Sequence, residues 1–265
     1  MSKEYKKIAK FLLGENIDTF SAVRAENLCV INERNFPDGT KSAVMFLIPY
    51  YTGQHEDRNV SLYAVSRDYH LYIKELSSRF SDDGVHFYLF FADTSPINER
   101  DAALKAGLGF KGRNGLVINE KYGSYVFIGT VLTDADFDED EYVSEFHEGS
   151  CEDCGLCKKN CAYLRGDSDI CLSELTQRKN VTSDELERIR NHSLVWGCDT
   201  CQEVCPHNKG VLETPIDFFR RDLLPKIDCE TVENMSKEEF SMRAYAWRGK
   251  KTILRNLQVD NSQEN

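Results

Sequence analysis

Two cysteine-rich stretches, CEDCGLCKKNC at residues 151–161 and GCDTCQEVCPHN at residues 197–208, indicate how the middle of this chain folds. The first has the spacing C-x2-C-x2-C-x3-C, the ligand run of bacterial ferredoxins, in which the fourth cysteine ligates a second cluster. Together with Cys171, the two stretches hold eight of the ten cysteines in the 265-residue sequence. Eight thiolates match two [4Fe-4S] clusters with none left over, so we predict a ferredoxin-like module with both clusters.

The spacing also predicts which cysteines share a cluster. Because the fourth cysteine of the run crosses over, we expect each half of the module to supply one ligand to the other half's cluster. The predicted sets are Cys151, Cys154, Cys157 and Cys205 for one cluster, and Cys161, Cys171, Cys198 and Cys201 for the other. Zinc is the alternative, because paired C-x2-C motifs also bind zinc, although zinc sites do not normally use this triple spacing. Cys29 and Cys229 lie outside the module and are expected to be ordinary thiols.

Composition and charge narrow the class of protein. Hydrophobic residues make up 41% of the chain and charged residues 29%, which excludes a largely disordered or fibrous protein. No apolar run reaches the roughly 18 residues of a membrane helix, and the N-terminus has no apolar signal-peptide segment. We therefore expect a cytoplasmic protein without a membrane partner, in which metal-binding cysteines are more common than disulfides. The net charge of −11 argues against a general nucleic-acid binder.

The residues before the cysteine module alternate between helical and strand-like patterns. Apolar residues recur at helical spacing in three ranges, and short, nearly continuous apolar runs mark buried strands. The predicted helices are 3–13, 60–80 and 98–106, and the predicted strands are 42–49, 85–92, 116–119 and 124–132. This order favours an α+β fold, with an α/β layered domain over residues 1–148. Residues 149–212 form the predicted cluster module, and residues 213–265 form a helical segment with a basic stretch.

Residues outside the module are candidates for binding or catalysis. Three glycines match a dinucleotide-binding fingerprint: Gly107, Gly109 and Gly112. They follow a helical stretch instead of a strand, so a helix C-cap is the favoured interpretation. Asp93 follows a predicted buried strand, where an apolar setting suits a general acid, although capping of the next helix is the alternative. His70 and Arg100, taken alone, fit a packed histidine and an arginine in a surface ion pair.

Four stretches together resemble the epoxyqueuosine reductase family, the cobalamin- and iron-sulfur-dependent enzymes of queuosine-tRNA maturation. They are YAVSRDYH at 63–70, DTSPINER at 93–100, KAGLGFKGRN at 105–114 and the cysteine stretch at 197–208, with a weaker echo at 248–256. The resemblance extends over about residues 40–256. Ser66 stands where the family usually has glycine, and Ala162 stands where the ferredoxin run usually has proline.

The resemblance implies cobalamin as a further cofactor of the layered domain and assigns roles to individual residues. Asp93 matches the family's proposed proton donor, Arg100 a substrate-binding residue, and His70 a residue of the cofactor or substrate pocket. The same pocket would include Arg67, Tyr69, Gly107, Gly109, Gly112 and Asn114. The implied reaction is the reduction of epoxyqueuosine to queuosine in tRNA, with electrons from an external flavodoxin or ferredoxin passing through the two clusters.

Two other functions stay open at this point. One is a related reductase that acts on another substrate, and the other is a ferredoxin-type electron carrier, which would need neither a corrin pocket nor Asp93. Longer family members carry a C-terminal helical repeat region that helps to hold tRNA, and we expect this chain to lack it. The basic stretch 241–258 is then the candidate for contact with the anticodon stem-loop, or else a solvated helix face.

Overall fold

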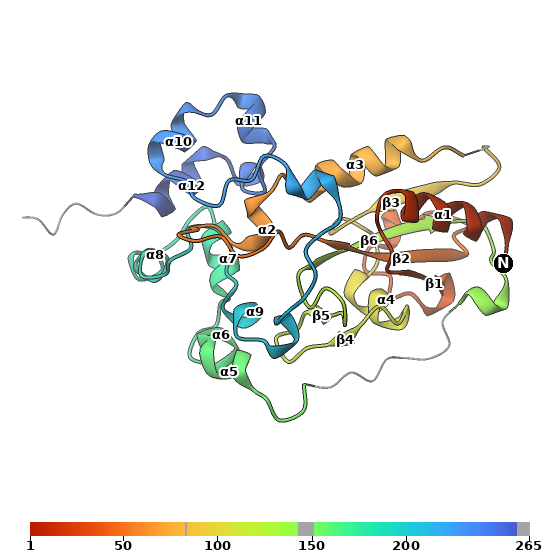
Figure 1. Ribbon diagram of the computed structural model, residues 1–265, viewed down its shortest axis with the longest axis horizontal. Coiled ribbons are helices and arrows are strands. Elements are labelled where there is room, and N and C mark those ends of the chain that lie inside the picture. Colours follow the sequence, from red (N-terminus) through yellow and green to blue (C-terminus); the bar gives the residue numbers. More distant parts are fainter. Residues whose placement is uncertain (83, 143–150, 259–265) are drawn as a thin grey trace, which may run out of the picture. The chain divides into compact units, whose positions relative to one another are not determined.

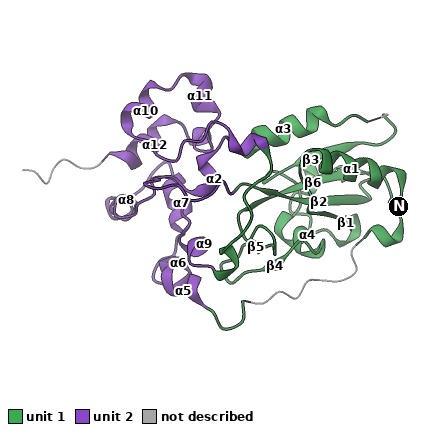
Figure 2. Ribbon diagram, in the orientation of Figure 1, with its two compact units in different colours: residues 1–50, 69–154, 206–216 green, residues 51–68, 155–205, 217–265 purple. Residues whose placement is uncertain are grey.

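A computed structural model describes residues 1–82, 84–142 and 151–258, and it divides the chain into two compact units (Figure 2). Unit 1 contains Met1–Tyr50, Tyr69–Cys154 and Pro206–Ile216, and unit 2 contains Tyr51–Asp68, Gly155–Cys205 and Asp217–Asn265. The units are therefore interleaved along the chain and do not follow the three consecutive segments predicted from the sequence. The predicted boundary between residues 148 and 149 lies outside the described residues.

Unit 1 is built on a four-stranded antiparallel sheet (Figure 1). The strand order is β1 (Phe20–Arg24), β2 (Ser42–Pro49), β6 (Val126–Thr133) and β3 (Tyr88–Phe91). All eight residues of β2 are buried, as expected for a central strand that is covered on both faces. A separate two-stranded pair, β4 (Phe110–Lys111) and β5 (Val117–Ile118), follows the helix α4 (Glu99–Lys105).

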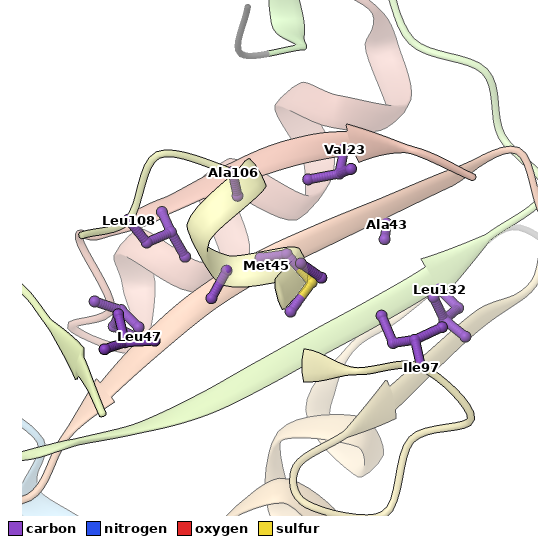
Figure 3. Packing of buried hydrophobic residues seen from close by; sticks show 11 residues of the cluster. Val23, Ala43, Met45, Leu47, Ile97, Ala106, Leu108 and Leu132 are labelled. Carbon is purple, nitrogen blue, oxygen red and sulfur yellow. The ribbon is translucent and has the colours of Figure 1, made fainter. Parts of the chain in front are cut away.

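Alternate residues of the strands face two helical layers. Met45, Leu47 and Leu132 point toward α4 and pack with Ala106 and Leu108 (Figure 3). The opposite face carries the cross-strand neighbours Val44, Val131 and Phe90, and it is covered by α1 (Lys3–Gly14) and α3 (Tyr69–Arg79). Phe11 of α1 packs edge-on against Phe90, with ring centroids 6.0 Å apart. The predicted mixture of helix and sheet in layers is confirmed.

Among the described residues of unit 2, the regular elements are helices and no strand is formed. Its helices are α2 (Leu62–Val65), α5 (Leu156–Asn160), α6 (Ala162–Arg165), α7 (Leu172–Gln177), α8 (Ser183–Arg190), α9 (Thr200–Glu203), α10 (Cys229–Asn234), α11 (Lys237–Ser241) and α12 (Lys250–Leu257). Trp196 and Tyr245 are fully buried and meet edge-on in its core, with ring centroids 6.1 Å apart. The C-terminal helices thus share one core with residues 51–68, which explains why they do not form a separate segment. No helix in the described ranges is long and apolar enough to cross a membrane.

The predicted elements agree with the structure where the pattern is long and regular. Strand 42–49 and the first helix are found, whereas the predicted strand 85–92 shortens to residues 88–91. The predicted helix 60–80 is wrong as a single element, because it breaks into α2 and α3. The break is stabilised from far along the chain, since the Asp68 amide donates to the carbonyl of Met242. Strand β1 was not predicted.

Candidate functional site

Asp93 lies in the connection that follows β3, with its side chain exposed and its backbone in the left-handed region at φ 61°. The Tyr69 hydroxyl donates a hydrogen bond of 3.0 Å to Asp93 Oδ2. Left-handed backbone is uncommon outside glycine, although aspartate tolerates it better than most residues, and such conformations gather at functional sites. The alternative of helix capping is wrong, because the N-cap of α4 is Asn98, whose Oδ1 accepts from the Asp101 amide.

A second carboxylate holds the Asp93 backbone. The Asp93 amide donates to Glu99 Oε2 at 2.7 Å, so the first turn of α4 is tied to the connection before it. Burial raises the pKa of the Glu99 carboxyl, and the nearby Asp93 charge raises it further, while hydrogen bonds from Asp93 and Ser95 oppose the shift. Sequence reasoning did not single out Glu99, although it belongs to the 93–100 stretch. The clue in the sequence that Glu99 could contact Asp93 was the six-residue spacing between them.

These groups border a cavity of about 430 Å³ within unit 1. Its polar side chains include Tyr69, Asp93, Glu99 and Arg100, and its apolar ones are Ile31, Ile97, Val126, Phe127 and Ile128. The Arg100 side chain is held by Gly115, because its Nη1 donates to the Gly115 carbonyl at 3.1 Å. Tyr69 stacks on Phe127 with ring centroids 4.0 Å apart, and His70 packs beside Tyr69 at 4.1 Å. Three predicted residues therefore line this cavity, namely Tyr69, Asp93 and Arg100. His70 is not among the lining residues but packs against Tyr69.

Two of the predicted glycines line a different cavity of unit 1. Gly107 and Gly109 border a space of about 520 Å³ together with Phe110 and His207. Gly107 has φ 67° and ends α4 in a Schellman turn, in which the amide of Leu108 donates to the carbonyl of Ala103. A Cβ on Gly109 would lie 2.3 Å from the Ile118 carbonyl oxygen. The helix C-cap prediction is confirmed, and the dinucleotide fingerprint lacks the strand-to-helix context it needs.

The remaining predicted pocket residues lie in neither cavity. Gly112 and Asn114 shape the turn between β4 and β5, where Asn114 Oδ1 accepts from the Leu116 amide at 3.2 Å. In the same turn the Arg113 amide donates to Cys151 Sγ at 3.3 Å, a contact that sequence reasoning missed. Arg67 belongs to unit 2, where its guanidinium stacks on Phe218 at 4.0 Å.

The second predicted set of cysteines lies entirely within unit 2. Burial raises the pKa of the Cys201 thiol to about 12, and the charges of Cys198, Cys161, Cys171 and Cys157 add to the shift. Because charge interactions fade with distance, these thiols lie near Cys201, and Cys157 of the first predicted set is among them. No group of three His, Cys, Asp or Glu side chains in the described ranges is arranged to hold a single metal ion, so the cluster assignment and the zinc alternative both stay predictions. The first predicted set stays a prediction, because its members belong to both units.

A buried ion pair stabilises the segment that carries Cys198 and Cys201, which includes the start of α9. Arg58 Nη1 lies 2.9 Å from Asp199 Oδ2, and the two side chains are 7% and 0% exposed. Asp199 also accepts from the Ser61 hydroxyl at 2.5 Å and from the Leu62 amide at 2.8 Å. Asp199, one of the two residues between these cysteines, is thereby bonded to the segment that leads into α2. Sequence reasoning missed this pair, because its partners are far apart in the chain.

Most of the basic stretch 241–258 is engaged in structure within unit 2. Three of its basic side chains donate to backbone carbonyls: Lys250 to Glu233 and Met235, Arg243 to Asp222, and Arg255 to Arg178 and Lys179. Arg248 stacks on the exposed ring of Trp247 at 3.8 Å, and Lys251 is exposed. Few of these basic side chains therefore form the solvated helix face that was the alternative to contact with RNA.

Comparison with known proteins decides the family. No family model matches the chain. The epoxyqueuosine reductase of Cyclobacterium marinum is 32% identical over 227 residues, which cover 80% of this chain and 72% of that protein. The chain belongs to the epoxyqueuosine reductase family. Family members from Lactococcus garvieae and Staphylococcus aureus are each 37% identical, over 183 and 174 residues. The chain spans about half of their length, with 50% and 44% covered.

Solved structures of the family have the same fold. The epoxyqueuosine reductase of Streptococcus thermophilus matches with a TM-score of 0.75 at 22% identity, over 97% of this chain and 80% of that one. An epoxyqueuosine reductase solved with an epoxyqueuosine-modified tRNA-Tyr stem loop matches with a TM-score of 0.76 at 23% identity, over 96% and 80%. At these identities the likeness establishes the fold.

Proposed function

We propose that the chain reduces epoxyqueuosine to queuosine in tRNA. Membership of the epoxyqueuosine reductase family supports the reaction, and the relative solved with a modified tRNA stem loop supports the substrate. The observation that carries the proposal is the placement of Asp93 at the rim of the unit 1 cavity, with Tyr69 and Glu99 holding it. A plain electron carrier has no use for such a site. A tRNA substrate places the reaction in the cytoplasm.

The change from epoxide to alkene consumes two electrons and two protons and releases one water. Asp93, when protonated, donates one proton to the departing oxygen, and the Tyr69 hydroxyl orients the Asp93 carboxyl through its bond to Oδ2. Glu99 accepts from the Asp93 amide and so holds the backbone from which the carboxyl projects. Arg100, held by the Gly115 carbonyl at the same cavity, is the proposed substrate-binding residue.

The chain's own residues suit the cofactors of the family. Cobalamin would supply the reducing centre, and the apolar wall of Ile97, Val126 and Ile128 beside Asp93 would suit the flat face of its corrin ring. We assign one [4Fe-4S] cluster to Cys161, Cys171, Cys198 and Cys201, and the other to Cys151, Cys154, Cys157 and Cys205. The electrons come from an external flavodoxin or ferredoxin.

Asp93→Asn tests the proposal. Asparagine tolerates the left-handed backbone and can accept from Tyr69, but it has no carboxylic proton to donate. We expect turnover of an epoxyqueuosine-containing anticodon stem-loop to fall about 10²–10⁴-fold, while cluster and cobalamin content stay unchanged. Asp57→Asn is the matched control, because Asp57 is also exposed and left-handed at φ 55°.

Two results would contradict parts of this proposal. Full turnover in Asp93→Asn would remove the assigned role of the carboxyl. Fully loaded wild-type protein that leaves the modified stem-loop unreduced would overturn the substrate and favour a related reductase with another substrate.

A further inference from the structure

His192, which follows α8 in unit 2, is held in one tautomer. The backbone amide of Leu194 donates to His192 Nδ1 at 3.1 Å. A nitrogen that accepts a hydrogen bond carries no proton, so the imidazole is neutral and its single N–H is on Nε2. The ring therefore has one donor, and the direction of that donor is set by the Leu194 amide.

The donor points to a threonine that contacts a cysteine. His192 Nε2 lies 3.4 Å from Thr200 Oγ1 and 3.9 Å from Cys198 Sγ. Thr200 Oγ1 in turn lies 3.3 Å from Cys198 Sγ. Because Nε2 donates to the threonine oxygen, the threonine hydroxyl hydrogen is available for the sulfur. The chain of donors then runs in one direction, from the Leu194 amide through His192 and Thr200 to Cys198.

We infer that Thr200, oriented by His192, donates a hydrogen bond to the Cys198 sulfur and sets the reduction potential of the cluster that Cys198 ligates. The inference rests on the proposed function only through the assignment of Cys198 to a [4Fe-4S] cluster. Reduction adds one negative charge to the cluster, and a donor at a ligating sulfur stabilises that charge. Donors in a chain also polarise one another, so His192 strengthens the bond that Thr200 makes. Thr200 and His192 are thus positioning residues that make this cluster easier to reduce.

Three variants separate this effect from a structural one. Thr200→Val removes the hydroxyl but keeps the branched shape, Thr200→Ser keeps the hydroxyl, and His192→Phe removes the donor behind it. The measurement is an anaerobic redox titration of protein loaded with both clusters, in which each cluster is followed by electron paramagnetic resonance. The unaltered cluster is the control within each sample.

Thr200→Val should lower the reduction potential of one cluster and leave the other unchanged. We expect the ratio of reduced to oxidised cluster to fall about tenfold at a fixed potential, which is ~59 mV for a one-electron couple. Thr200→Ser should keep the wild-type value, and His192→Phe should shift the same cluster in the same direction by a smaller amount.

The inference and the proposed function fail in different ways. Unchanged potentials in Thr200→Val and His192→Phe would overturn the inference, and so would a shift in Thr200→Ser equal to that of Thr200→Val. Protein that holds no cluster dependent on Cys198 would overturn it together with the ligand assignment. The expected potential shift in protein that does not reduce epoxyqueuosine would support the inference and refute the substrate.

Discussion

Replacing Arg58 by methionine should destabilise unit 2 more than any exposed arginine would. The change leaves Asp199, which is fully buried, without the cation 2.9 Å away. Removing one partner of a buried ion pair costs about 3–5 kcal/mol. The Ser61 hydroxyl and the Leu62 amide still bind the carboxylate, so we expect the lower end, about 3 kcal/mol. A domain of this size loses about 2–4 °C in melting temperature per kcal/mol, so the expected loss is about 6–12 °C.

Arg79→Met is the matched control, because Arg79 also pairs with a carboxylate, that of Glu15, with hydrogen bonds of 3.0 and 2.7 Å. Those side chains are 42% and 23% exposed, and a pair so accessible to water contributes about 0.2–1 kcal/mol. The assay is thermal melting of anaerobically prepared, cluster-loaded protein, followed by circular dichroism. The double variant Arg58→Met/Asp199→Leu should lose less than the sum of its single variants, because no charge is left unpaired. Equal losses in Arg58→Met and Arg79→Met would refute this reasoning.

Three further predictions concern other parts of the chain. Gly109→Ala should cost about 1–3 kcal/mol in urea unfolding, because its Cβ would lie 2.3 Å from a backbone oxygen, whereas Gly14→Ala, with nothing within 4 Å, should change stability by less than about 0.5 kcal/mol. Since the folded state raises the pKa of Glu99 above its ordinary value of 4.5, the folded protein binds this proton more tightly, and stability falls as pH rises above that value. As pH rises from acidic to neutral, the free energy of unfolding of Glu99→Gln should therefore increase relative to that of wild type. A difference between the two proteins that stays constant across this range would contradict the prediction. Cys171→Ser should lower the iron content from about eight to about four per chain, while Cys29→Ser leaves it unchanged. Equal iron content in the two cysteine variants would count against the ligand assignment.

Features that depend on local spacing can be predicted from the sequence. The nearly continuous apolar run at 42–49 predicts a strand with the bounds that the structure has, because such a run fits a strand buried on both faces. The turn at Gly107 was predicted because a glycine after a helical stretch suits a left-handed C-cap. The cysteine spacing and the family stretches likewise needed no knowledge of distant contacts, and both pointed to the family that the comparisons confirm.

Which distant residues share an environment follows only from the folded structure. The folded chain forms two interleaved units, and Arg58 pairs with Asp199. The predicted helix 60–80 is interrupted where the Asp68 amide donates to the Met242 carbonyl. The fold also excludes Asp93 as the cap of α4, because Asn98 caps that helix and the Asp93 amide donates to Glu99. The physical reason is that helices, turns and ligand runs depend on neighbours within a few residues. Burial and hydrogen-bond partners depend on segments that meet only when the chain is folded.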